Sequence, residues 1–146
     1  YYGAEWLEVV TSIESNVYTD TVQHADKLKT QFPNVKFSLI DGDSRQLVPG
    51  ILKDNSPDKA EHLDWATIDG GHDYDSCIKD MDNVHPFMAP GGVILIDDYK
   101  AHPPEGSREE GVDRACEEFY KEHEALYDLH EWNVKGKGFC VLTRKA

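Results

Sequence analysis

Three aspartates stand directly after two short apolar runs of the sequence. Asp69 follows Leu63–Ile68, and Asp97 and Asp98 follow Val93–Ile96. Carboxylate oxygens are preferred ligands of hard cations such as Mg²⁺ and Mn²⁺, which keep further positions for water or substrate oxygens. If the two runs are neighbouring strands, the three acids meet at one edge of a sheet. Asp69, Asp97 and Asp98 therefore predict a metal site.

A histidine lies three residues beyond the first of these acids, in the segment Asp69-Gly70-Gly71-His72. The two glycines allow a tight backbone turn that leaves the imidazole free to reach the acids. Because histidine titrates near neutral pH, His72 beside a metal is a candidate general base. The plainer alternative is a solvated loop histidine without a chemical role.

Acids close the other apolar runs as well. Glu14, Asp41, Asp69 and Asp97 follow one another at steps of 27, 28 and 28 positions, each long enough for one strand and one helix. In open α/β sheets, ligands bind at the carboxyl ends of the strands. We therefore expect these acids, with Asp43, to line one cleft. Since aspartate also favours turns and helix caps, a structural role for any single acid stays an alternative.

The elements that must position these acids alternate along the chain. Apolar runs predict strands at Glu8–Ile13, Val35–Ile40, Leu63–Ile68 and Val93–Ile96, and apolar periodicity predicts helices at Asp20–Phe32, Asp75–Met88 and Ser107–Glu124. The last helix opens with Ser107 and Glu110 in capping-box spacing. Strands that are apolar on both faces and alternate with helices predict a mostly parallel sheet covered by helices on both faces.

The end of the chain has a different pattern. Leu126–Trp132 and Phe139–Thr143 flank a turn rich in glycine and lysine, which predicts an antiparallel hairpin at one edge of the sheet. The remaining irregular segments, Asp54–His62 and Lys100–Gly106, are expected to be loops. The predicted fold class is therefore α/β, with a mostly parallel sheet and a C-terminal antiparallel edge.

Composition excludes several classes of function. The chain has 146 residues, 15 basic and 28 acidic, and a formal net charge of −13. Nucleic acids and anionic membranes are bound mainly by clustered Lys and Arg, so neither is an expected partner. No apolar run approaches the length of about 20 residues that spans a bilayer. Cys77, Cys116 and Cys140 lack CxxC spacing, which indicates reduced, buried thiols and a cytoplasmic protein.

Two segments carry a family resemblance. Trp65–Tyr74, with its Asp-x-x-His, and Met88–Tyr99, with its acidic pair, resemble the S-adenosylmethionine-dependent methyltransferases. More narrowly, they resemble the metal-dependent small-molecule O-methyltransferases that include macrolide sugar O-methyltransferases. The resemblance implies a Rossmann-like fold, Mg²⁺ or Mn²⁺ held by Asp69, Asp97 and Asp98, and His72 as the base that deprotonates a hydroxyl.

The resemblance also implies a cofactor site for S-adenosylmethionine. It assigns Glu14 to the ribose hydroxyls and Asp43 and Ser44 to the adenine, with Asp69 nearby. The family's first strand and glycine-rich loop should precede Glu14, where Gly3 is the sole glycine. We therefore expect residues 1–146 to form a single methyltransferase-like domain that lacks its N-terminal part.

The function that follows is metal-assisted O-methylation of a small molecule such as a sugar, a polyketide or a catechol. One alternative is a catalytically inactive methyltransferase-like domain that serves as a binding or scaffold module. Another is a two-component receiver domain, in which the acidic pair precedes the single aspartate, the reverse of the order here. The sequence leaves open the acceptor, the metal and the oligomeric state, a homo-oligomer included.

Overall fold

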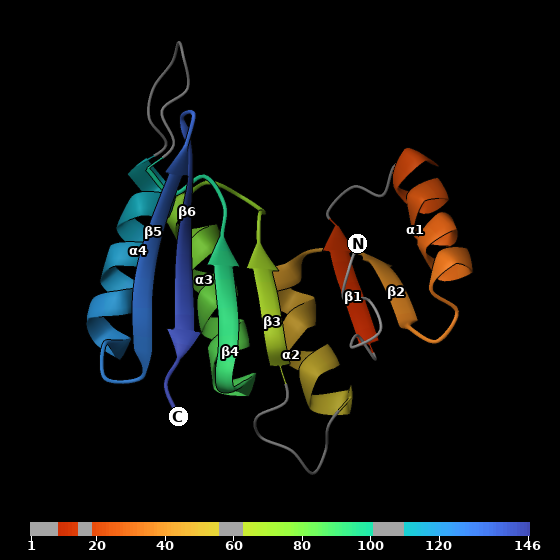
Figure 1. Cartoon of the computed structure of the whole chain (residues 1–146), viewed down its shortest axis with the longest axis horizontal. Coiled ribbons are helices and arrows are strands. Elements are labelled where there is room, and N and C mark those ends of the chain that lie inside the picture. The colour runs from red at the N-terminus through yellow and green to blue at the C-terminus, as the bar shows by residue number, and fades with distance from the viewer. Residues whose placement is uncertain (1–8, 15–18, 56–62, 101–109) are drawn as a thin grey trace. The chain divides into compact units, whose positions relative to one another are not determined.

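Residues 9–14, 19–55, 63–100 and 110–146 are described by a computed structural model (Figure 1). The chain divides into two units, Tyr1–Leu47 and Val48–Ala146, which are described separately below. The boundary falls inside helix α2 (Ser44–Asn55). Val48 of this helix packs against the hydrophobic core of the C-terminal unit.

The N-terminal unit holds one strand–helix–strand motif. Strands β1 (Val9–Glu14) and β2 (Lys36–Asp41) pair in parallel and are joined through helix α1 (Thr19–Gln31). Parallel strands need such a crossover, which here buries Ala25 of the helix. In the register of the pair, Glu14 lies opposite Asp41, so both acids stand at the carboxyl end of the strands.

The C-terminal unit is built on a four-stranded sheet. The strand order is β3-β4-β6-β5, with β3 (Leu63–Ile68), β4 (Met88–Ile96), β5 (Tyr127–Val134) and β6 (Lys137–Arg144). β3 and β4 are parallel, whereas β6 is antiparallel to both β4 and β5. Lys135 and Gly136 turn the hairpin with φ of 55° and 84°, the left-handed values of a two-residue type I′ loop. This antiparallel edge argues against the all-parallel sheet of a receiver domain.

Helices α3 (Tyr74–Val84) and α4 (Glu110–His123) lie against one face of this sheet (Figure 1). Side chains alternate between the faces of a strand, so in β4 only every second residue meets the helices. Ile94 and Ile96 are 0% and 1% exposed, while Val93 and Leu95, which alternate with them, are only half-buried. The core between sheet and helices includes Met81, Met88, Phe119, Tyr127 and Leu142.

The fold class confirms the prediction of an α/β protein with parallel pairing and an antiparallel hairpin edge. Two adjoining element boundaries were predicted wrongly, the end of one helix and the start of the next strand. The helix predicted to reach Met88 ends at Val84, and a short 3-10 turn, η2 (His85–Phe87), follows it. Pro86 offers no N–H for the next helical hydrogen bond, which disfavours continuation of the helix. β4 then begins at Met88, with Pro90-Gly91-Gly92 inside the strand rather than before it.

Helix α2 was not predicted at all. Pro49 and Gly50 lie in its interior, and both residues ordinarily mark the end of a helix. Ser107 of the predicted capping box lies outside the described residues, as do most of the predicted loops Asp54–His62 and Lys100–Gly106. None of the helices in the described part of the chain is long and apolar enough to cross a bilayer.

The cysteines are placed as the sequence predicted. Cys77, Cys116 and Cys140 are buried in the core of the C-terminal unit, and none is in a disulfide. The neighbouring thiols of Cys140 and Cys77, together with burial, raise the pKa of the Cys116 thiol. Protonated thiols of this kind act as small apolar side chains and are unreactive.

Candidate functional site

Three potential ligand groups meet just beyond the carboxyl ends of β3 and β4. The ligand atoms of Asp69, His72 and Asp98 all lie within 4.8 Å of one another. His72 Nε2 lies 3.3 Å from Asp98 Oδ2, and these two side chains are 39% and 34% exposed. Two carboxylates and one imidazole, open to solvent, are donors that suit a divalent cation. The same geometry lets the Asp98 carboxylate orient the imidazole.

Strand pairing explains why the acids come together. In the parallel register Ile68 lies opposite Ile96, and the N–H of Asp97 donates to the Ile68 carbonyl at 3.0 Å. Asp69 therefore leaves the sheet at the level of Asp97, and Asp98 follows one residue further along. Asp98 has a left-handed backbone with φ 59°, a conformation that a non-glycine residue rarely adopts and that often marks a functional site.

Asp97 is engaged differently from Asp98. Its Oδ1 accepts the backbone N–H of Asp98 at 2.8 Å, so the side chain folds back onto its own turn. Among the described residues, the ligand group contains Asp69, His72 and Asp98 but not Asp97. The metal-binding role of Asp97 remains a prediction.

Helix α4 holds the segment that carries His72. Gly111, near the start of the helix, is so close to this segment that a Cβ there would lie 2.5 Å from the His72 carbonyl oxygen. The Arg114 guanidinium lies over the Tyr74 ring, 4.2 Å from its centroid, and the Tyr74 hydroxyl donates to Glu118 at 2.6 Å. The Glu118 carboxylate raises the pKa of Tyr74.

The hairpin of β5 and β6 holds the turn that carries Asp98. Tyr99, 2% exposed, donates its hydroxyl to Glu131 at 2.8 Å, and the Lys100 ammonium donates to the same carboxylate at 2.8 Å. These bonds lower the pKa of Glu131, the lysine having the larger effect. Gly138 of β6 faces the same turn: a Cβ there would overlap the Tyr99 carbonyl oxygen.

The close backbone approaches at Gly111 and Gly138 were not predicted from the sequence, although one weak signal was present. Gly111 interrupts the predicted helix Ser107–Glu124, and an interior glycine often marks a close backbone approach. Gly138 was assigned to the hairpin turn, whereas the structure places it inside β6. The partner of that approach cannot be read from the sequence, because 39 positions separate Gly138 from Tyr99.

Replacing Gly138 with alanine is expected to destabilise the protein by about 2–4 kcal/mol, because the new methyl group overlaps backbone atoms that cannot move as a side chain would. Thermal unfolding followed by circular dichroism measures the effect. Gly50→Ala in α2 is the matched control. Among the residues that the structure describes, no atom outside its own helix lies within 4 Å of the added Cβ, so we expect a gain of about 0.5–1 kcal/mol. Equal melting temperatures for the two variants would contradict the close approach.

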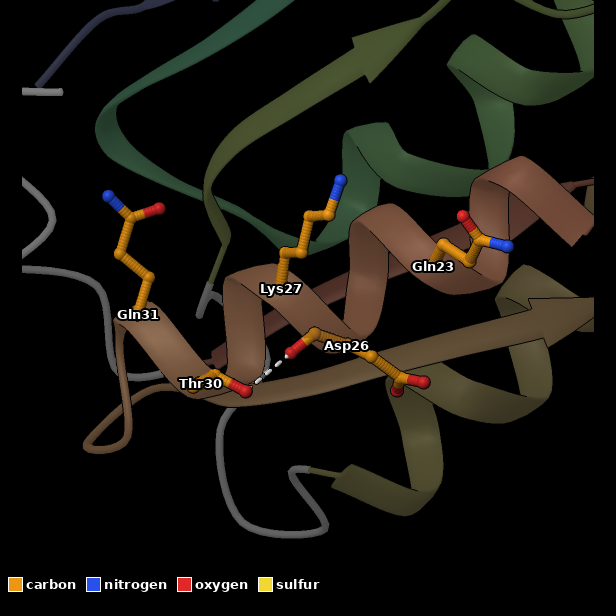
Figure 2. Close-up of a pocket in the computed structure, with 5 residues that line it drawn as sticks. All are labelled: Gln23, Asp26, Lys27, Thr30 and Gln31. Carbon is orange, nitrogen blue, oxygen red and sulfur yellow. Dashed lines mark hydrogen bonds between the residues drawn. The ribbon is translucent and has the colours of Figure 1, made fainter.

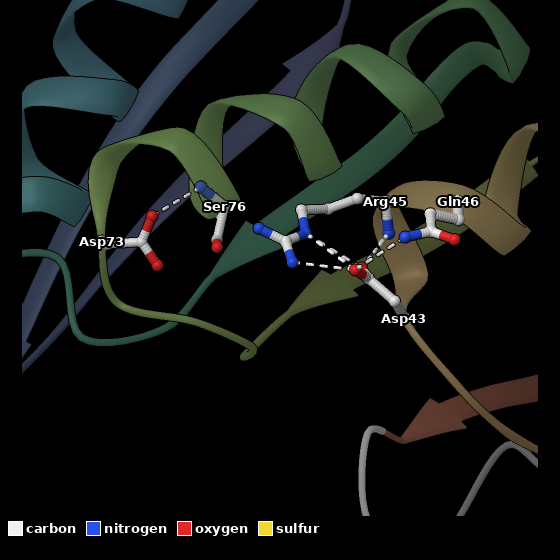
Figure 3. A network of polar contacts seen from close by, with 5 residues as sticks. All are labelled: Asp43, Arg45, Gln46, Asp73 and Ser76. Carbon is white, nitrogen blue, oxygen red and sulfur yellow. Dashed lines mark hydrogen bonds and ion pairs between the residues drawn. The ribbon is translucent and has the colours of Figure 1, made fainter.

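The residues assigned to cofactor binding lie in both units. Glu14 ends β1 and Ser44 begins α2, directly after Asp43. Asp43 caps this helix: its carboxylate accepts the Arg45 N–H at 3.0 Å and pairs with the Arg45 guanidinium at 2.8 Å (Figure 3). The guanidinium hydrogen bond lowers the pKa of Asp43. Asp69 belongs to the C-terminal unit, so the convergence of all four strand ends on one cleft remains a prediction.

A similar cap fixes the start of α3. The Asp73 carboxylate accepts the Ser76 N–H at 2.9 Å (Figure 3), which sets where the segment after His72 becomes helical. A separate depression on α1 is lined by exposed polar residues of this one helix, where Thr30 Oγ1 donates to the Asp26 carbonyl at 2.9 Å (Figure 2). It contains none of the predicted site residues and shows no arrangement suited to catalysis.

Comparisons with known proteins identify the fold. A family model described as a methyltransferase domain matches residues 5–99. No curated protein sequence matches the chain significantly. Among solved structures, a Staphylococcus aureus protein described as a caffeoyl-CoA O-methyltransferase aligns with a TM-score of 0.62 at 18% identity. The alignment covers 92% of this chain and 64% of that one.

Two further structures come from antibiotic biosynthesis. A TDP-rhamnose 3'-O-methyltransferase of calicheamicin biosynthesis aligns with a TM-score of 0.64 at 13% identity, over 98% of this chain and 59% of that one. The mycinamycin-pathway methyltransferase MycE, in complex with Mg, SAH and mycinamycin VI, aligns with a TM-score of 0.59 at 16% identity, over 97% and 46%. The chain thus spans less than two thirds of the length of these three structures, which share its fold.

Proposed function

Because the chain belongs to the methyltransferase-domain family, we propose that it takes part in S-adenosylmethionine-dependent methylation of a hydroxyl group on a small molecule, assisted by a divalent metal. The observation that carries this proposal is the group formed by Asp69, His72 and Asp98 at the carboxyl ends of two parallel strands. Such strand ends are where open α/β sheets bind their ligands.

Asp69 and Asp98 are the residues that would hold the metal. The donor set fits Mg²⁺ or Mn²⁺, since both side chains offer carboxylate oxygens and the site is open enough for further oxygen ligands. When bound, the metal would lower the pKa of the acceptor hydroxyl, and S-adenosylmethionine would supply the methyl group. His72 would take the proton from the hydroxyl, with its ring held by the Asp98 carboxylate.

Glu14, Asp43 and Ser44, together with Asp69, are the proposed cofactor contacts. A carboxylate at the end of β1 can accept hydrogen bonds from two ribose hydroxyls, which supports Glu14 in this role. Asp43 is already engaged by Arg45, so we propose that the contact to adenine involves the start of α2 rather than a free carboxylate there.

The acceptor we propose carries two adjacent hydroxyl groups, as in a catechol or a sugar diol, because such a pair could occupy two open metal positions. Two fold neighbours support a sugar-type acceptor in a general way: one is a TDP-rhamnose 3'-O-methyltransferase, and the other is bound to mycinamycin VI with Mg and SAH. The clustered donor groups favour a catalytic site over the inactive scaffold alternative, since adjacent carboxylates repel each other without a cation.

Calorimetric titration with S-adenosylhomocysteine tests the cofactor class. We expect binding to the wild-type chain, and an affinity at least tenfold weaker in Glu14→Gln, because a hydrogen bond to a charged group contributes about 1.5–3 kcal/mol. Glu124→Gln, which removes an exposed acid just after α4, is the matched control and should bind like the wild type.

The same titration is repeated with Mg²⁺ and then with a chelator. Absence of S-adenosylhomocysteine binding in both conditions would overturn the proposed function for this chain and favour the scaffold alternative. If S-adenosylhomocysteine binds, catechol and methyl rhamnoside are tested as acceptors with S-adenosylmethionine, and the S-adenosylhomocysteine formed is measured.

A further inference from the structure

We infer that Asp113 on α4 is a positioning residue, whose carboxylate fixes the turn that carries Asp98 and so sets the divalent-metal affinity of the site. Asp113 is 6% exposed and accepts the backbone N–H of Lys100 at 2.5 Å. It contacts the chain two residues beyond Asp98. This inference rests on the proposed function, because it concerns the ligand geometry of the same metal site.

The turn after β4 needs external support because its backbone is unusual. Asp98 and Lys100 both have left-handed conformations, with φ of 59° and 51°. A non-glycine residue in such a conformation is strained and persists only where its surroundings enforce it. Without support, either residue would relax to an ordinary negative φ, and the Asp98 carboxylate would turn away from His72.

Contacts from three elements support the turn. Tyr99 is anchored through its hydroxyl to Glu131 of β5, and its carbonyl faces Gly138 of β6. The Lys100 carbonyl accepts the Asn133 side-chain amide at 3.3 Å. These contacts hold Tyr99 and the far side of Lys100, whereas Asp113 holds the N–H of Lys100 from the helix. Since that N–H belongs to the peptide joining Tyr99 and Lys100, the carboxylate of Asp113 restrains the φ of Lys100 directly.

Asp113 also links the two halves of the site. It lies two residues after Gly111, whose missing side chain lets α4 approach the His72 carbonyl. The first turns of one rigid helix thereby contact the segment that carries His72 and the turn that carries Asp98. Groups that orient metal ligands in this way typically change metal affinity by about 10–100-fold when they are removed.

Mn²⁺ titration followed by electron paramagnetic resonance of the free ion tests the inference in four variants of the chain. Asp113→Ala removes the acceptor, Asp113→Asn keeps an acceptor oxygen without the charge, and Asp113→Glu keeps the charge but displaces it. Glu117→Ala is the control: it removes an exposed carboxylate of α4 that lies 4.0 Å from the Lys100 ammonium. Amide hydrogen exchange of residues 97–100 reports on the turn without metal.

We expect the Kd for Mn²⁺ to rise at least tenfold in Asp113→Ala and Asp113→Glu. Asp113→Asn and Glu117→Ala should stay within about threefold of the wild type, since both keep the acceptor for the Lys100 N–H. Exchange of residues 97–100 should accelerate only where affinity falls. If Asp113→Ala does not fold, Asp113→Glu against Asp113→Asn decides the question.

Two results would overturn the inference while leaving the proposed function intact. One is wild-type Mn²⁺ affinity in folded Asp113→Ala or Asp113→Glu, and the other is an equal loss in Asp113→Asn, which would mean that the charge itself acts. A wild-type chain that binds no Mn²⁺ would overturn the metal site and this inference together. Binding of S-adenosylhomocysteine would then still show whether the cofactor class holds.

Discussion

Replacing His72 with glutamine is expected to lower kcat for methyl transfer by about two to four orders of magnitude, the range that general acid–base catalysis contributes. Glutamine keeps much of the volume and one hydrogen-bonding group but cannot take up the hydroxyl proton. The rate of S-adenosylhomocysteine formation is measured against pH, with whichever probe acceptor the wild type methylates. The variant should gain rate as the pH rises, because hydroxide replaces the missing base.

Metal affinity separates the two roles that the geometry allows His72. As a base held by Asp98, it can be lost with little change in Mn²⁺ affinity; as a metal ligand, its loss should weaken Mn²⁺ binding at least tenfold. His130→Gln is the control, an exposed histidine on β5. A His72→Gln variant with wild-type kcat and wild-type Mn²⁺ affinity would leave the histidine without a role in the reaction.

The local pattern was enough to predict much of what surrounds His72. The run Leu63–Ile68 became β3 with the same bounds, although only Ile68 of this strand is buried. Parallel pairing with β4 followed from the alternation of strands and helices. Once those two strands are neighbours, residues just beyond their ends must lie close together, which is why Asp69, His72 and Asp98 could be grouped from the sequence.

Contacts between distant parts of the chain could not be predicted in the same way. From the sequence, Gly138 was assigned to the glycine- and lysine-rich turn of the hairpin, and only the fold shows that it lies in β6 and faces Tyr99. Asp113 is read as one acid on a helix, yet it is buried against the Lys100 N–H. Both depend on how α4 and the hairpin pack on the end of β4. Helix α2 was not predicted because Pro49 and Gly50 have low helix propensity. In the structure, packing of the helix through Val48 outweighs this propensity.

The adjacent acids Asp97 and Asp98 show most clearly where the sequence and the structure lead to different expectations. The sequence predicts that both bind the metal. In the structure, the Asp97 carboxylate accepts the Asp98 N–H. The left-handed backbone of Asp98 directs its own carboxylate toward His72. Asparagine at position 97 can still accept that N–H through its side-chain oxygen, whereas asparagine at position 98 removes a charged ligand. Asp97→Asn therefore keeps the hydrogen bond within the turn, whereas Asp98→Asn removes a charged metal ligand.

We expect millimolar Mg²⁺ to raise the melting temperature of the wild-type chain, because a ligand that binds only the folded state stabilises it, by about 2.7 kcal/mol at a concentration 100 times its Kd. Asp98→Asn should abolish this rise, and Asp97→Asn should keep most of it. Melting is followed by circular dichroism with Mg²⁺ and with a chelator, and Asp128→Asn, an exposed acid on β5, controls for lost surface charge. Equal losses in the two variants would make Asp97 a ligand, as the sequence predicts. An unchanged wild-type melting curve would instead remove the metal from the mechanism, because a cation that binds only the folded chain must stabilise it.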